Sequence, residues 1–178
     1  MDETANGRGG TIVVGLDGST HAEEALRYAV DEAALRGLGV RVVVAHEPPD
    51  AWMADFGMPL MADDGGLRRA VEDSARARVE ELRGAMDAAE QAVPVEVLAV
   101  SGSPAHVLVQ EAENAALLVV GHRGRGGLRS RLLGSVGLAV VLRAPCPVTV
   151  VPAPRVVEET TPQDAAALAG PLAAGPLA

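Results

Sequence analysis

Five short apolar runs punctuate the chain, and all are rich in valine and other residues that favour β-structure. Polar positions do not alternate strictly with apolar ones inside these runs, as they would in a strand with one solvent-exposed face. We therefore expect buried strands that are covered on both faces. The runs are Thr11–Leu16, Val40–Ala45, Val95–Val100, Leu117–Val120 and Val148–Val151.

Between these runs, apolar residues recur every three or four positions, which is the period of a helix with one buried face. The first helix is expected to begin near Thr20, because Thr20 and Glu23 have the spacing of a capping box. Glycine or proline follows the first and last helical patterns and is expected to end them. The four predicted helices run from near Thr20 to Gly37, over 67–89, from Ser103-Pro104 onward, and over 135–143.

Strands and helices alternate along the chain, and this alternation implies a parallel sheet with helices on both faces. The expected fold class is therefore α/β, a single domain built on an open parallel five-stranded sheet and covering 11–152. The N-terminal residues 1–10 and the Pro/Ala-rich stretch 153–178 carry no strand or long helix pattern. We expect both segments to be disordered.

Composition narrows the class of protein. The chain has 178 residues, of which 48% are hydrophobic and only 2% aromatic, so the core must be built from Ala, Val and Leu. No apolar run approaches the roughly 20 residues of a membrane span, and the start of the chain lacks a signal-peptide pattern. Cys146 is the single cysteine, which fits a cytoplasmic protein. The net charge of −9 argues against nucleic-acid binding.

A glycine-rich segment after the fourth strand is the main candidate for chemistry. Gly121, Gly124 and Gly134 let the backbone approach an anion closely, and Ser135 begins the next helix, whose free amides favour negative charge. Four arginines, of which Arg123 or Arg125 is the preferred phosphate contact, crowd this part of a chain that contains no lysine. No Gly-Lys-Ser/Thr follows the glycines, so the segment is not a P-loop.

The spacing of these residues resembles the nucleotide motif of the ATP-binding branch of the universal stress protein family. The motif is Gly121-x2-Gly124-x9-Gly134-Ser135, and it matches without a gap. Three further segments resemble the family in the right order. They are the first strand and turn at 13–19, the glycine turn at 101–105 and the closing strand at 144–151.

This resemblance implies a Rossmann-like fold of the adenine-nucleotide alpha-hydrolase type with strand order 3-2-1-4-5. The first and fourth strands would then be neighbours, and ligands bind at such a switch point beyond the carboxyl ends of the strands. The resemblance also implies ATP, with Mg²⁺, as the ligand. It further implies a homodimer formed through the edge strand 148–151.

By the same resemblance, Asp17 would lie near the adenosine part or hold the metal ion, and the chain around Ala45 would contact adenine. The expected nucleotide-binding residues are Gly15, Asp17, Ala45, Gly121, Arg123, Gly124, Gly134, Ser135 and Val136. Relatives often have a hydroxyl residue where this chain has Gly137. That phosphate contact is therefore not transferred.

Several candidate residues also have a structural interpretation. The glycine segment could be a turn, and Asp17 could cap the first helix, a role that Ser19 or Thr20 could also fill. Cys146 lies between two prolines and is expected to be structural. Three histidines lack metal-ligand spacing and are expected to be hydrogen bonded or exposed to solvent: His46, His106 and His122.

Three functions remain open from the sequence. A nucleotide-responsive regulatory protein of the stress response ranks first. A slow ATPase ranks below it, because hydrolysis needs a positioned water and the sequence offers no recognisable base. A nucleotide-independent dimeric interaction protein ranks third, since the glycine motif is intact.

Overall fold

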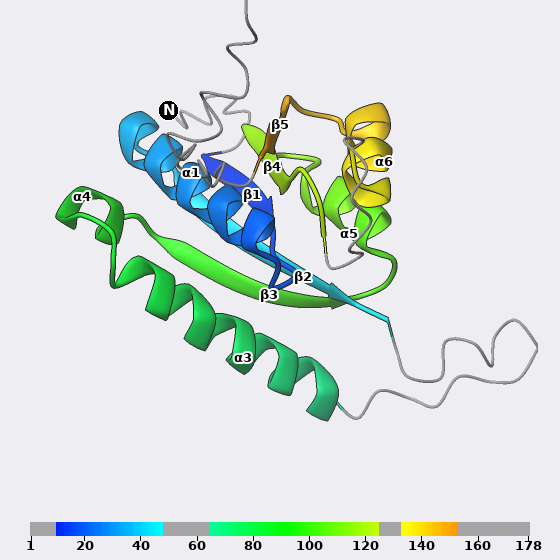
Figure 1. The fold of residues 1–178 in the computed structure, drawn as a ribbon, viewed down its shortest axis with the longest axis horizontal. Coiled ribbons are helices and arrows are strands. Elements are labelled where there is room, and N and C mark those ends of the chain that lie inside the picture. Colours follow the sequence, from blue (N-terminus) through cyan, green and yellow to red (C-terminus); the bar gives the residue numbers. More distant parts are fainter. Residues whose placement is uncertain (1–9, 48–64, 125–132, 153–178) are drawn as a thin grey trace, which may run out of the picture.

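The computed structural model describes residues 10–47, 65–124 and 133–152. A parallel sheet of five strands forms its centre, in the order β3-β2-β1-β4-β5 (Figure 1). This confirms the predicted sheet and strand order. The strands are β1 (Thr11–Gly15), β2 (Gly39–His46), β3 (Val95–Ser101), β4 (Leu117–Gly121) and β5 (Val148–Val151).

The helices also agree with the sequence pattern, with one exception. The single helix predicted over 67–89 is wrong, because the chain turns after Gly84 and a short second helix follows. Asp87 and Glu90 form a capping box that starts this second helix. The helices are α1 (Thr20–Arg36), α3 (Gly66–Arg83), α4 (Ala88–Gln91), α5 (Pro104–Glu111) and α6 (Ser135–Arg143).

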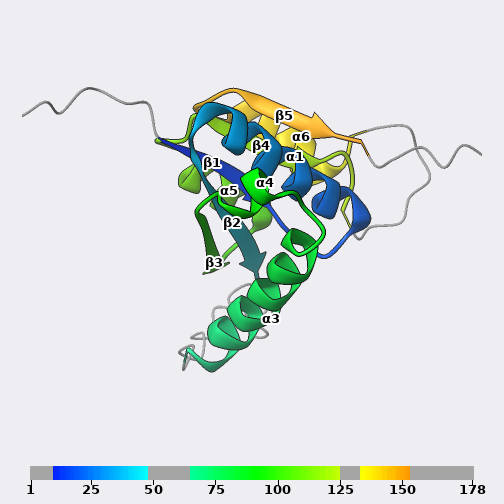
Figure 2. The same ribbon diagram turned by 90° about the vertical axis from the view of Figure 1, so that its left-hand side faces the viewer.

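The helices cover the sheet on both faces (Figures 1 and 2). Helices α1 and α3 pack on one face over a core that includes Ile12, Val14 and Val79. Helices α5 and α6 pack on the other face over a second core that includes Val13, Leu118 and Val140. Both cores consist mainly of Ala, Val and Leu, as the shortage of aromatic residues requires.

The strand register brings the functional loops to one edge of the sheet. Ile12 of β1 lies opposite Val40 of β2 on one side and Leu117 of β4 on the other. The chain leaves β1 through α1 on one face and leaves β4 through α6 on the opposite face. The carboxyl ends of β1 and β4 therefore form the switch point at which ligands bind in open α/β sheets.

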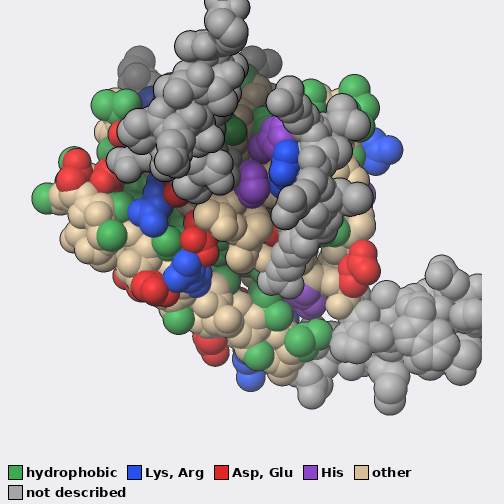
Figure 3. Space-filling model, in the orientation of Figure 1, with side chains coloured by type: hydrophobic (Ala, Val, Ile, Leu, Met, Phe, Trp, Pro, Cys, Tyr) green, Lys and Arg blue, Asp and Glu red, His purple; other side chains and the backbone are tan. Residues whose placement is uncertain are grey.

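The surface over α1 and α3 carries acidic and basic side chains that are interleaved rather than segregated (Figure 3). Ion pairs account for this pattern, for example Arg76 with Glu72 on α3 at 2.7 Å, a pairing the sequence spacing predicts. Among the helices the structure describes, none has the length and apolar character that crossing a membrane requires.

Candidate functional site

The turn between β1 and α1 supplies the first side of the site. The Oδ1 atom of Asp17 accepts a hydrogen bond from the amide of Ser19 at 3.0 Å, and Gly18 between them has a φ of 78°. Only glycine adopts this backbone conformation readily. The turn holds the Asp17 carboxylate at the carboxyl end of β1.

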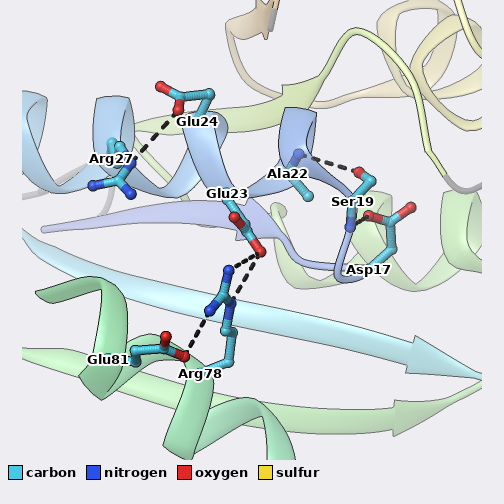
Figure 4. A network of polar contacts seen from close by, with 8 residues as sticks. All are labelled: Asp17, Ser19, Ala22, Glu23, Glu24, Arg27, Arg78 and Glu81. Carbon is cyan, nitrogen blue, oxygen red and sulfur yellow. Dashed lines mark hydrogen bonds and ion pairs between the residues drawn. The ribbon is translucent and has the colours of Figure 1, made fainter.

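Ser19, not Thr20, caps helix α1. Its Oγ atom accepts a hydrogen bond from the amide of Ala22 at 3.2 Å (Figure 4). The predicted capping box of Thr20 and Glu23 is therefore wrong, although the helix does begin at Thr20. Glu23 instead reaches across to α3, where it accepts hydrogen bonds from Arg78 at 2.5 and 2.9 Å (Figure 4).

Arg78 links α3 to α1 and also pairs with Glu81 at 2.6 Å. The hydrogen bond to Glu23, followed by that to Glu81, raises the pKa of the Arg78 guanidinium. This cluster links α3 to α1 on the surface of the protein. The carboxylate of Glu23 therefore pairs with α3 and does not point to the candidate site as a ligand.

The end of β4 supplies the second side of the site, and it lies directly against the start of α1. A Cβ atom at Gly121 would lie 2.7 Å from the carbonyl carbon of His21 and 2.9 Å from the amide nitrogen of Ala22. Backbone atoms cannot yield as a flexible side chain can, so this position excludes any residue with a side chain. The next amide, that of His122, donates to the carbonyl of Val151 at 2.7 Å.

The two sides meet at Gly124 and Arg123. A Cβ atom at Gly124 would lie 2.6 Å from Oδ2 of Asp17. The hydroxyl of Ser19 donates to the carbonyl of Arg123 at 3.4 Å. Asp17, Arg123 and Gly124 therefore converge on one place, as predicted from widely separated parts of the sequence.

The start of α6 completes this side of the site. Gly134 precedes the helix with extended backbone, and its amide donates to the carbonyl of His122 at 3.0 Å. Ser135 and Val136 form the first turn, so their amides lie at the positive end of the helix dipole. A Cβ atom at position 134 would meet nothing closer than 3.6 Å, so packing alone does not require a glycine there.

Gly137, in the first turns of α6, is buried under a neighbouring side chain. A Cβ atom there would lie 2.9 Å from Cδ1 of Leu133. The small residue therefore leaves room for the side chain of Leu133. The predicted phosphate contact of Arg125 falls within 125–132, outside the residues that the structure describes.

Two further predicted residues, Gly15 and Ala45, lie at the ends of neighbouring strands. Among the hydrogen bonds of the described residues, none joins them to the glycine segment. Gly15 ends β1, and a Cβ atom there would lie 3.1 Å from the side chain of Leu108 on α5. Ala45 is the penultimate residue of β2 and packs partly buried against the α5 side of the sheet. Both lie at the carboxyl edge, on β1 and its neighbour β2.

The histidines differ from the sequence interpretation in one respect. His106 is exposed, as expected, and the ring of His122 lies 6.3 Å from that of His21 between centroids. Both ring nitrogens of His46 are buried and have no hydrogen-bond partner, so the expectation of a hydrogen-bonded or solvent-facing ring is wrong there. A lone histidine after a valine run gives no sequence signal for such a position.

No group of three or more His, Cys, Asp and Glu side chains is arranged to hold a metal ion within the described ranges. Burial raises the pKa of the Cys146 thiol, which makes the thiolate scarce at neutral pH and agrees with a structural role.

A groove of about 300 Å³ lies elsewhere, between α3 and the edge strand β3. Its lining includes Glu72, Arg76 and Glu80, which belong to the ion pairs of α3. None of the predicted site residues lines it. The loops at the ends of β1 and β4 remain the candidate site.

The fold and this pair of loops define a Rossmann-like α/β protein with a glycine cradle at its switch point. The sequence model of the Universal stress protein family matches residues 10–152. A universal stress protein of Thermus aquaticus is 38% identical over 144 residues, 79% of this chain and 97% of that protein. The chain belongs to the universal stress protein family.

Other relatives extend the comparison. A universal stress protein of Mycobacterium tuberculosis is 37% identical over 144 residues, which cover 79% of this chain but only 47% of that protein. The chain thus spans nearly all of the Thermus relative and about half of this mycobacterial one.

Solved structures of the family contain adenine nucleotides. A universal stress protein in complex with cAMP is 29% identical, with a TM-score of 0.56 over 81% of this chain and 97% of that one. The Archaeoglobus fulgidus protein in complex with dAMP is 26% identical, with a TM-score of 0.52 over 79% of this chain and 96% of that one.

Proposed function

We propose that this protein binds ATP at the carboxyl ends of β1 and β4 and acts as a nucleotide-responsive regulatory protein of the stress response. The observation that carries the proposal is the meeting of Gly124 with the carboxylate of Asp17, with which a Cβ atom at position 124 would collide. The family relatives in complex with cAMP and dAMP support an adenine nucleotide as the ligand.

The phosphates would lie against the glycine segment. Gly124 presents backbone without a side chain, and the amides of Ser135 and Val136 stand at the positive end of α6. This is a favourable arrangement for an anion. Arg123, next to Gly124 in the chain, would add positive charge, and the hydroxyl of Ser135 would add a donor.

The adenosine part would lie toward β1 and β2. Asp17 would accept hydrogen bonds from ribose hydroxyls or, together with phosphate oxygens, bind Mg²⁺, which prefers oxygen ligands. Gly15 and the backbone around Ala45 would line the adenine side. The donor set of a single carboxylate beside a phosphate cradle fits a magnesium nucleotide.

The proposal favours binding over turnover. Hydrolysis would require a general base and an oriented water in addition to the phosphate cradle. Asp17 already accepts a hydrogen bond from Ser19, and the motif supplies no second candidate for the base. The response to ATP would then come from occupancy of the site.

The same proposal includes a cytoplasmic homodimer formed through β5. This strand pairs with β4 along one edge and is half-buried at every residue. Its other edge is not paired within the described sheet, and strand edges of this kind pair readily with a second chain.

Calorimetry with ATP and Mg²⁺ tests the site directly. Gly124→Ala should lower the affinity for ATP by a factor of about 5 to 140, because overpacking against Asp17 costs about 1–3 kcal/mol and 1.4 kcal/mol is a factor of ten. Gly84→Ala at the end of α3 is the matched control and should bind as the wild type does, since its Cβ would meet nothing closer than 3.5 Å.

Two results would contradict the proposal in different ways. A wild-type protein that does not bind ATP removes the function, whereas undiminished affinity in Gly124→Ala removes the site assignment alone. Mass analysis of the ligand retained on purification would distinguish ATP from AMP or a cyclic nucleotide.

A further inference from the structure

Two histidine side chains from distant parts of the sequence lie next to each other where β4 ends and α1 begins. His21 stands in the first turn of α1, and His122 directly follows β4. The centroids of their rings are 6.3 Å apart, with an angle of 30° between the ring planes. No spacing motif in the sequence indicates this pair, because only the packing of α1 against the end of β4 brings the two residues together.

The fold holds the backbone under both rings in place. A Cβ atom at Gly121 would lie 2.7 Å from the carbonyl carbon of His21, so the start of α1 lies directly against the end of β4. The amide of His122 donates to the carbonyl of Val151 at 2.7 Å, and its carbonyl accepts from the amide of Gly134 at 3.0 Å. The two rings can therefore change their separation only by rotation of their side chains.

Both rings are accessible to small ions and are not engaged elsewhere. His21 and His122 are each half-buried. Among the contacts of the described residues, neither ring takes part in a hydrogen bond or an ion pair. A neutral imidazole has one ring nitrogen with a lone pair, and histidine is the commonest metal ligand in proteins. Two such nitrogens are therefore available at one place on the surface.

The separation of the rings fits a shared metal ion after a small rotation. Two imidazoles on a tetrahedral ion, with metal–nitrogen distances of about 2.0–2.1 Å, have ring centroids roughly 5 Å apart. The rings of His21 and His122 must therefore approach by about 1 Å, a shift that partly exposed side chains make by small changes of χ1 and χ2. The carboxylate of Asp17, in the turn that leads into α1, offsets the positive end of the helix, which would otherwise disfavour a cation.

We propose that His21 and His122 together bind a divalent transition-metal ion of the zinc, nickel or copper class. Imidazole nitrogen suits these ions, whereas Mg²⁺ prefers oxygen ligands. Two protein ligands leave the remaining coordination positions open to water or to another small ligand. The site differs in its chemistry from any Mg²⁺ that accompanies ATP, and it does not depend on the proposed nucleotide function.

Calorimetry with Zn²⁺ at neutral pH, in excess Mg²⁺ and without nucleotide, measures this site. The wild type should bind one Zn²⁺ per chain. His21→Ala and His122→Ala should each weaken Zn²⁺ at least about tenfold, because even the loss of a group that only supports a metal ligand costs about 10–100-fold in metal affinity. The electron paramagnetic resonance spectrum of bound Cu²⁺ should show two imidazole nitrogens in the wild type and one in each variant.

A matched control uses a histidine that stands alone. His106→Ala removes an exposed ring on α5 and should leave the affinity for Zn²⁺ unchanged. Circular dichroism and urea unfolding without metal establish that each variant is folded. His21→Gln and His122→Gln, which keep a polar side chain, take the place of an alanine variant that fails to fold.

The outcomes are decisive and separate from those for ATP. Unchanged Zn²⁺ affinity in both the His21 and the His122 variants, or a loss only in His106→Ala, would overturn the proposal. A Cu²⁺ spectrum with a single imidazole nitrogen in the wild type would do the same. Because no nucleotide is present, a protein that fails to bind Zn²⁺ can still bind ATP, and the reverse also holds.

Discussion

Gly121 and Gly124 belong to the same segment, yet different neighbours exclude a side chain at each. At Gly121 the neighbours are backbone atoms of His21 and Ala22 in α1. At Gly124 the neighbour is the carboxylate of Asp17, the end of a side chain that can turn away. The first glycine is therefore a requirement of the fold, and the second is a requirement of the proposed site.

This distinction predicts a stability effect at Gly121. Gly121→Ala should reduce the free energy of unfolding by about 1–3 kcal/mol, because the new methyl group forces β4 and α1 apart. Urea denaturation measures the change. Gly10→Ala provides the control, since a Cβ atom there has no neighbour within 4 Å. Equal stability of the Gly121→Ala and Gly10→Ala variants would show that β4 and α1 do not approach so closely.

A serine stands at the N-cap position of both α1 and α5, but only one of the two caps its helix with its side chain. Ser19 accepts a hydrogen bond from the amide of Ala22, whereas Ser103 makes no side-chain cap and is followed by Pro104. A serine before a helix looks the same in both sequences. The two serines differ in side-chain rotamer, which tertiary contacts decide, and only the rotamer of Ser19 makes the capping hydrogen bond.

The two caps therefore predict unequal effects. Ser19→Ala should destabilise the protein by about 1 kcal/mol, the usual cost of removing a helix cap. Ser103→Ala should leave the stability within about 0.5 kcal/mol of the wild type. Thermal and urea unfolding of both variants test this. A loss at Ser103 as large as that at Ser19 would contradict the observed cap geometry.

The helix predicted over 67–89 is two helices in the structure, α3 and α4. Its apolar stripe continues as far as Met86, which packs against the core beyond the helix end. The chain nevertheless turns after Gly84, and the guanidinium of Arg83 donates to the carbonyls of Gln91 and Val93. The spacing of Asp87 and Glu90 carried the signal for a new helix, because it is that of a capping box.

For the whole molecule, the sequence predicts the layers of the fold better than the details of the site. Continuous apolar runs require burial on both faces, and this is sufficient for a parallel sheet. The meeting of Asp17 with Gly124 depends on the adjacency of β1 and β4, which the resemblance implied and the runs alone did not. The burial of the two ring nitrogens of His46 depends on side-chain packing, for which a single sequence has no pattern.

The proposed dimer can be tested by a substitution on its edge strand β5. Thr149→Lys places a charge on the edge strand β5, and two such charges would face each other near the axis of an antiparallel strand pair. We expect the mass measured by light scattering to fall from that of a dimer to that of a monomer. The circular dichroism spectrum should stay unchanged, because Thr149 is only half-buried. A wild-type protein that is already monomeric would disprove the dimer.

The hydroxyl of Ser19 both accepts from Ala22 and donates to Arg123, and this double use limits how position 19 can evolve. Threonine carries the same group and satisfies both neighbours. Aspartate keeps the acceptor but has no proton to donate when ionised. It would therefore cap the helix but lose the hydrogen bond to the carbonyl of Arg123. Alanine loses both. Selection at this one position therefore acts on the start of a helix and on the placement of the glycine cradle together.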